Sequence, residues 1–167
     1  GAAAATTTWH QVKKDASTVL SGVTAVRGQV SSGSYGAVMA LTSTGQVYTW
    51  GNSVYLGDAN NSSSKNYATL MTLPAEFSSS NIPKMIGVTG GIKGTSTVKN
   101  TYYLVSNLGS LYAMGDNSKK QCGTFNTTEQ KSWVKAKVNS TTDFSNVSYI
   151  SVQEHDASFP AVAAITT

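Results

Sequence analysis

Glu154, His155 and Asp156 are adjacent in the sequence, and their types could carry general acid–base catalysis. In such chemistry a histidine moves a proton while a neighbouring carboxylate orients its ring. Adjacent residues on a strand point to opposite faces, so these three side chains would not converge on one substrate. We therefore interpret the trio as a polar strand end, and we predict no catalytic residues and no enzymatic activity.

Residues that could bind a metal or a phosphate group are equally sparse. The chain has two histidines and one cysteine, which lie far apart in the sequence and form no zinc pattern. Residues 58–62 supply oxygen atoms but lack the alternation and the distal glutamate of a calcium loop. Residues 87–91 are glycine-rich but lack the Lys-Ser/Thr step of a phosphate loop. We predict no metal site and no cofactor.

Composition narrows the class of protein further. The 167 residues carry a net charge of +4, and only 12% of them are charged. Their lysines are scattered rather than clustered, which argues against a nucleic-acid partner. There is also no apolar run long enough for a transmembrane helix. The low charge and the many hydroxyl and amide side chains favour a β-rich protein with an extracellular or cell-surface location.

Cys122 has no second cysteine with which to form an internal disulfide. A reactive thiol needs surroundings that lower its pKa, and only Lys119 and Lys120 lie near it in the sequence. We interpret Cys122 as a small buried apolar side chain.

The elements that would position any functional side chain are short strands. Residues 35–50 are predicted to form two strands around a turn at Thr44-Gly45, because a glycine-containing connection joins an apolar run to an alternating one. The same hairpin is predicted for residues 102–114. Further strands are predicted at residues 9–12, 23–26, 68–73, 84–88, 133–138 and 147–150.

These elements recur along the chain. Residues 38–43 return at 162–167, 124 positions later, and at that offset Trp9 coincides with Trp133. Residues 45–52 recur 64 positions on, at 109–116. Because each repeated unit must bury its apolar face against its neighbours, the pattern predicts an all-β array of mainly antiparallel strands.

The units resemble RCC1-type repeats, which are blades of β-propellers. Residues 40–52, Ala-Leu-Thr-Ser-Thr-Gly-Gln-Val-Tyr-Thr-Trp-Gly-Asn, carry the resemblance, and residues 109–117 with 121–123 repeat it with Met114 in place of tryptophan. This resemblance implies one domain, with units at roughly 23–81 and 82–146 and partial units at 1–22 and 147–167. Two complete units form an incomplete ring, so the chain is a fragment, or it completes its sheets against other copies, or its repeat serves another small β fold.

Residues 9–30 also fit a competing pattern. Apolar residues from Trp9 to Val30 fall at steps of three and four, which is typical of an amphipathic helix. The copy at 133–150 keeps this spacing only in part, so strands are favoured. A helix within residues 3–30 is the alternative.

Aromatic residues fall into two groups. Tyr48 and Tyr112 recur at equivalent positions, as do Trp9 and Trp133, and such recurrence is typical of packing between units. Aromatic and amide side chains without repeated counterparts lie near loops and are the candidates for binding a ligand. These candidates are Tyr35, Tyr55, Asn60, Asn61 and Tyr67.

Three hypotheses of function follow. The first is a non-enzymatic binding or scaffolding module of an exported or surface-exposed microbial protein, which contacts a protein or glycan partner through its loops and could self-associate to cover open blade edges. The second, motivated by the helical pattern, is a type IV pilin-like filament subunit or tip adhesin without its N-terminal apolar helix. The third, implied by the RCC1 resemblance, is guanine-nucleotide exchange on a small GTPase.

Overall fold

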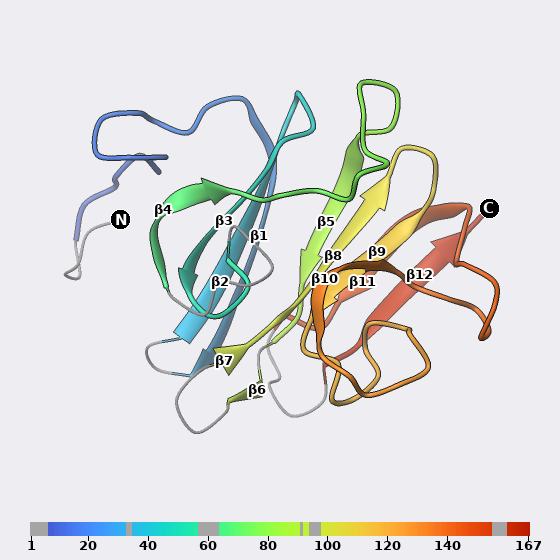
Figure 1. Cartoon of the computed structure of the whole chain (residues 1–167). Helices are drawn as coiled ribbons and strands as arrows, with labels where there is room; N and C mark the ends of the chain where they lie inside the picture. Colours follow the sequence, from blue (N-terminus) through green and yellow to red (C-terminus); the bar gives the residue numbers. More distant parts are fainter. Residues whose placement is uncertain (1–6, 33–34, 57–63, 91, 94–97, 155–159) are drawn as a thin grey trace.

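The chain is all-β in a computed structural model that describes residues 7–32, 35–56, 64–90, 92–93, 98–154 and 160–167. Within these ranges there are strands and turns but no helix, and the strands form three antiparallel sheets and one short ribbon (Figure 1). None of the described segments is a helix long and apolar enough to cross a membrane.

The first sheet has the strand order β1-β2-β3-β4. Its central hairpin confirms the prediction for residues 35–50, because Ala40 lies opposite Tyr48 and the turn places Gly45 at a φ of 80°. The sheet consists of β1 (Val23–Ser32), β2 (Tyr35–Thr42), β3 (Val47–Asn52) and β4 (Lys65–Leu70).

The second sheet has the equivalent order, β10-β9-β8-β5, and contains the predicted second hairpin. It consists of β5 (Pro83–Val88), β8 (Thr101–Ser106), β9 (Leu111–Gly115) and β10 (Gln130–Lys135). Between β5 and β8 the chain forms a ribbon of β6 (Ile92–Lys93) and β7 (Val98–Lys99). A third sheet pairs β11 (Val147–Val152) with β12 (Val162–Thr166).

The alternative of a helix within residues 3–30 is wrong for the described residues of that range, and so is the strand predicted at 9–12. Residues 12–20 instead form a narrow hairpin, in which the Leu20 N–H donates to the Val12 carbonyl at 2.8 Å. The Asp15 carboxylate accepts the N–H groups of Ser17 and Thr18, a local turn that competes with helical hydrogen bonds. The pilin-like hypothesis therefore loses the helical pattern as support.

The same narrow hairpin returns 124 positions later. Phe144 N–H donates to the Ala136 carbonyl at 2.8 Å, as Leu20 does to Val12. Asn139 takes the place of Asp15, and its side-chain oxygen accepts the N–H groups of Thr141 and Thr142. The sequence repeat thus corresponds to a repeated backbone conformation.

The main core lies between the first and second sheets. Met39 and Leu41 of β2 pack there with Tyr102 and Leu104 of β8 and with Tyr112 of β9. The hydroxyl of Tyr102, which is fully buried, donates to the Val54 carbonyl at 2.9 Å. A buried tyrosine needs such an acceptor, so the hydrogen bond also fixes the loop after β3 against the second sheet.

A second core lies between the second and third sheets. Successive residues of β8 alternate between the two cores, so Tyr103 and Val105 pack with Val147 and Ile150 of β11. Every residue of β8 is buried as a result. The second sheet is therefore the centre of the molecule, with an apolar layer on each face.

The recurrent aromatic residues differ in how deeply they are buried. Tyr48 and Tyr112 are buried, as predicted, and so is the thiol of Cys122. Trp133 is partly buried and donates through its ring N–H to the Thr72 carbonyl at 3.0 Å. The prediction that Trp9 packs in the core is wrong, because Trp9 is fully exposed. The described residues beside Trp9 form no sheet that could cover it, since the hairpin of residues 12–20 begins only after it.

Gly51, the last residue but one of β3, and Gly115, the last residue of β9, have positive φ angles of 123° and 115°. A Cβ at Gly51 would collide with the backbone carbonyl of Gly36, and one at Gly115 would collide with that of Asn100. Both the backbone angle and the close approach of the neighbouring strand therefore require glycine.

We predict that Gly115→Ala lowers the free energy of unfolding by about 2 kcal/mol or more, because strained backbone and a backbone collision act together. Urea denaturation measures this change. The matched control is Gly28→Ala in β1, where φ is not positive and the nearest atom to the new Cβ is a Val38 methyl carbon at 3.9 Å. Equal effects of the two substitutions would contradict the explanation.

Candidate functional site

The linker between the first and second sheets, residues 71–82, departs from the repeated pattern. In the other two copies of this region a narrow hairpin follows, with Lys13 bridging to Val19 and Lys137 bridging to Asp143. The linker instead makes two separate turns, in which Phe77 N–H donates to the Pro74 carbonyl and Ser78 exchanges backbone hydrogen bonds with Asn81. The surface therefore differs here from that of its own repeats.

Contacts with the second sheet hold the linker in place. The ring of Phe77 lies 5.2 Å from that of Tyr112, measured between centroids. The Asn107 side chain accepts the Ile82 N–H at 3.0 Å and donates to the Ser80 carbonyl at 3.1 Å. The middle of the linker is thus fixed by ring packing on β9, and its C-terminal end is fixed by hydrogen bonds to the turn between β8 and β9.

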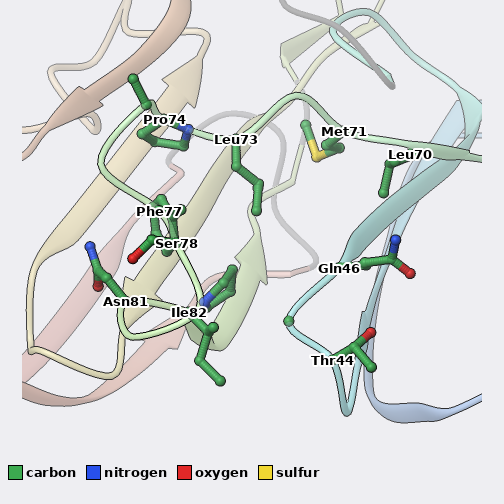
Figure 2. A pocket seen from close by; sticks show the side chains of 13 residues that line it. Thr44, Gln46, Leu70, Met71, Leu73, Pro74, Phe77, Ser78, Asn81 and Ile82 are labelled. Carbon is green, nitrogen blue, oxygen red and sulfur yellow. The ribbon is translucent and has the colours of Figure 1, made fainter.

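A groove of about 460 Å³ lies between the linker and the turn that joins β2 to β3 (Figure 2). Thr44 and Gln46 stand on the side of the turn, and Pro74, Phe77 and Ile82 stand on the side of the linker. At its closest point the turn nearly touches the linker, since a Cβ at Gly45 would lie 3.1 Å from the Cβ of Ile82. Its size falls in the range of small-ligand and peptide sites.

The lining of the groove is mainly apolar, with polar groups at its rim. The apolar side chains include Met71, Leu73, Pro74, Phe77 and Ile82, and the polar ones are Thr44, Gln46, Ser78 and Asn81. Such a surface can bind apolar side chains and can hydrogen-bond a backbone that runs along the rim. No group of His, Cys, Asp or Glu side chains suited to a metal ion occurs among the described residues.

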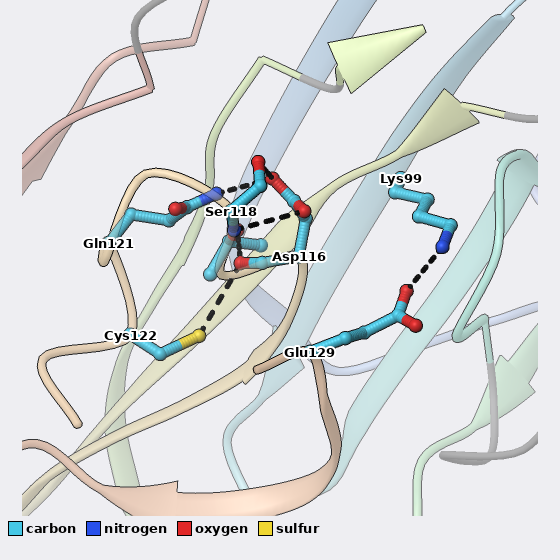
Figure 3. A network of polar contacts seen from close by, with 7 residues as sticks. Lys99, Asp116, Ser118, Gln121, Cys122 and Glu129 are labelled. Carbon is cyan, nitrogen blue, oxygen red and sulfur yellow. Dashed lines mark hydrogen bonds and ion pairs between the residues drawn. The ribbon is translucent and has the colours of Figure 1, made fainter. Parts of the chain in front are cut away.

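A network of polar side chains lies at the ends of the strands that are farthest from the groove (Figure 3). The Asp116 carboxylate, at the end of β9, accepts hydrogen bonds from Gln121 at 2.6 Å and from Ser118 at 3.0 Å. Its backbone carbonyl accepts the thiol of Cys122 at 3.4 Å and the hydroxyl of Thr101 at 2.6 Å. These bonds fold the segment after β9 tightly onto the sheet.

Polar contacts also connect the first two sheets at this end. The buried Asn100 side chain hydrogen-bonds to Gln29 of β1 and to Ser53, which directly follows β3. Glu129 lies 2.9 Å from the Lys99 ammonium (Figure 3) and interacts with the Tyr55 hydroxyl. Partial burial alone would raise the pKa of Glu129, but the hydrogen bond from Tyr55 and the charge of Lys99 hold it below its usual value.

The five binding candidates from the sequence do not form one site among the described residues. Tyr55 is 6% exposed, and burial raises its hydroxyl pKa. Tyr67 lies on β4 and is 38% exposed. Tyr35 begins β2, with its side chain outside the described part, and Asn60 and Asn61 lie wholly outside the described residues, as does His155. A role for these residues in binding stays a prediction.

A second, smaller cleft of about 170 Å³ lies where β1, β5 and β11 approach one another. Arg27 and Glu154 face each other across it at 4.0 Å, and their side chains are 43% and 44% exposed. Exposed pairs at this distance contribute little binding energy. The larger and better-fixed groove is therefore the candidate functional site.

Sequence reasoning missed the groove because it concentrated on what the repeats share. The signal that could have found the groove was the departure of the linker from the repeat. Pro74 and Phe77 stand where the first and third copies have the polar turns built around Asp15 and Asn139. A break in an otherwise regular repeat marks a segment that the shared fold does not require.

The sequence matches no family model and no curated protein. Several solved structures are similar in fold, human WBSCR16 and Prp20p among them. Human WBSCR16 has a TM-score of 0.59 and 14% identity, and Prp20p from Saccharomyces cerevisiae has a TM-score of 0.55 and 11% identity. Each match covers 87% of this chain and 31% of the other protein, so the chain spans about a third of their length. The likeness shows that the sheets are blades like those of RCC1-like propellers, which confirms the expected fold class.

We predict that the Cys122 thiol in the folded protein resists alkylation at pH 8. Burial, with a smaller contribution from the charge of Asp116, raises its pKa to about 12, so the reactive thiolate is scarce well below that pH. Labelling with iodoacetamide, followed by mass spectrometry, checks this. The unfolded protein in urea should take up one equivalent under the same conditions. Rapid labelling of the folded protein would show that the site is not closed.

Proposed function

We propose that this chain is a non-enzymatic protein-binding module whose partner occupies the groove between the β2–β3 turn and the linker. The observation that carries the proposal is that the chain departs from its own repeat where this groove forms. A narrow hairpin like that of residues 136–144, which lies between the second and third sheets, would suffice to connect two blades. A linker that adds an apolar groove instead is best explained by binding.

The chemistry of the groove favours an extended protein segment with apolar side chains over a glycan. Leu73, Phe77 and Ile82 are apolar and partly exposed, so burying them against apolar partner side chains is favourable, at about 25 cal/mol per Å². The exposed Gln46 and Ser78 side chains at the rim can hydrogen-bond the backbone of such a segment. The fixed linker would lose little conformational freedom on binding.

We also propose an exported or cell-surface location for the module. The support is compositional, since only 12% of the residues are charged and hydroxyl and amide side chains take the place of charges. Fractionation of cells that express the intact gene product, with detection by an antibody against this domain, tests the location independently of binding. Recovery of the protein only in the cytoplasmic fraction would refute it.

The proposed function predicts the effect of filling the groove. Peptides selected from a random library against the immobilised chain should lose affinity about tenfold or more when Ala75, an exposed lining residue, is changed to tryptophan. The matched control is Ser79→Trp, which adds the same side chain to an exposed position of the linker outside the groove. If neither substitution changes the affinity for the peptides, the peptides bind elsewhere and the groove is not the site.

A second candidate function is guanine-nucleotide exchange on a small GTPase. The observation that favours it is the fold shared with Prp20p, whose structure was described together with its binding to Gsp1p and histones. We predict that, if this function is correct, the purified chain accelerates release of fluorescent GDP from a small GTPase, and Gsp1p is the first protein to test for binding. Unchanged release rates at saturating chain would exclude it while leaving the groove proposal intact.

A further inference from the structure

Several asparagines of the chain lie in Asn-x-Ser/Thr sequences, at positions 60, 61, 126, 139 and 146. This pattern is the acceptor signal for N-linked glycosylation in exported proteins, and it also arises by chance in a chain rich in serine, threonine and asparagine. Asn60 and Asn61 lie outside the described residues. The structure discriminates among the other three asparagines because their surroundings differ.

Asn139 lies at the tip of the narrow hairpin of residues 136–144. Its side-chain oxygen accepts the Thr141 N–H at 3.0 Å, the Thr141 hydroxyl at 3.1 Å and the Thr142 N–H at 2.8 Å. Its amide nitrogen, Nδ2, makes no hydrogen bond to any described residue, and residues 138–143 are all exposed. A sugar can therefore be attached to Nδ2 without the loss of any bond that shapes the turn.

The exposure of this tip is a property of the hairpin itself. In the first copy Asp15 occupies the equivalent place, and its carboxylate accepts the N–H groups of Ser17 and Thr18 and the hydroxyl of Ser17. Residues 15–18 are exposed although the four-stranded first sheet follows them in the chain. The tip thus lies outside the packing of the blades in both copies, and a bulky group there is compatible with the array.

Asn126 is exposed, but its amide group is part of the structure of its loop. Nδ2 donates to the Thr124 carbonyl at 3.2 Å. The side-chain oxygen accepts the Thr128 N–H at 2.9 Å and the amide of the buried Asn117 at 3.2 Å. A sugar on Nδ2 would crowd these contacts, so the folded loop disfavours modification at Asn126.

Asn146 directly precedes β11, and the rest of its acceptor sequence is held in that strand. Val147, the middle residue of the sequence, is 3% exposed and packs in the second core. The Ser148 hydroxyl donates to the Ile165 carbonyl at 3.1 Å, so it is directed to β12 and not to Asn146. A transferase that must contact all three residues cannot do so while β11 is folded.

We propose that Asn139 carries an N-linked glycan in the exported protein. The inference rests on the proposed exported location and does not depend on the groove. In the transfer step, Nδ2 attacks the anomeric carbon of an oligosaccharide that is held on a lipid pyrophosphate. The bond from that carbon to the phosphate oxygen breaks, the lipid pyrophosphate leaves, and Nδ2 gives up one proton to the transferase. The product is a bulky, solubilising group on the hairpin between the second and third sheets.

The test isolates the intact gene product from the exported fraction of cells and digests it with chymotrypsin. Cleavage after aromatic residues places the three asparagines in separate peptides, namely residues 126–133, 134–144 and 145–149. We expect mass spectrometry to find a glycan on the peptide of residues 134–144 and none on the other two. Enzymatic release of the glycan should leave an aspartate in place of Asn139.

Three variants decide whether this turn is the acceptor. Thr141→Ser keeps the hydroxyl and should keep the glycan, whereas Thr141→Val removes the hydroxyl and should abolish the glycan. Asn139→Asp should also abolish it and should retain the fold, because Asp15 makes the same turn in the first copy. Its urea midpoint should match that of the parent chain produced without glycosylation.

The outcomes separate this inference from the proposed location. An exported protein whose residues 134–144 carry no glycan would overturn the inference and leave the location standing. Glycans on all three peptides would show that the sequence pattern alone selects the sites, and would overturn the assignment to Asn139. Recovery of the protein only in the cytoplasmic fraction would refute the location and this inference with it.

Discussion

Face-to-face burial of sheets is the constraint on which the rest of this structure depends. The strands of the second sheet place alternate side chains on both faces, so Tyr102 and Leu104 require the first sheet while Tyr103 and Val105 require the third. Each such side chain contributes about 2 kcal/mol when it is fully buried. A single sheet with two apolar faces is unstable in water, so the three sheets form as one array.

The two ends of the strands serve different purposes within this array. At one end, Asn100 hydrogen-bonds across to Gln29 of β1 and to Ser53 just after β3. At the same end, Asp116 folds the segment after β9 back onto its own sheet. Buried polar groups of this kind fix a single arrangement because an unpaired partner would be costly. At the other end the connections are turns and linkers on the surface, which can vary without disturbing the sheets.

Much of this fold could be predicted from the sequence because residues that are buried in each unit recur at equivalent positions. Tyr48 and Tyr112 recur at equivalent positions and both are buried, and of the two Tyr112 packs in the core between the first and second sheets. The two hairpins follow from glycine at each turn. The helical pattern from Trp9 to Val30, which was the alternative to strands, is wrong because apolar spacing says nothing about local polar turns. The Asp15 side chain accepts two backbone N–H groups in a tight turn, and the hydrogen bond from Leu20 N–H to the Val12 carbonyl closes a hairpin around it. The prediction for Trp9 is wrong for another reason, since recurrence in the sequence does not determine which segments cover a side chain.

The candidate site lay beyond sequence reasoning for a related physical reason. A groove depends on the distance between two segments that are far apart in the chain, here Gly45 in a turn and Ile82 in the linker. Neither residue is unusual in its own sequence context. Their approach follows from the packing of Phe77 on Tyr112 and from the bonds of Asn107 to the linker. The shared fold thus supplies the rigid walls of the groove, and the departure from the repeat supplies the space between them. In a repeat protein of this kind, irregular linkers are therefore the places where binding specificity can arise without loss of the core.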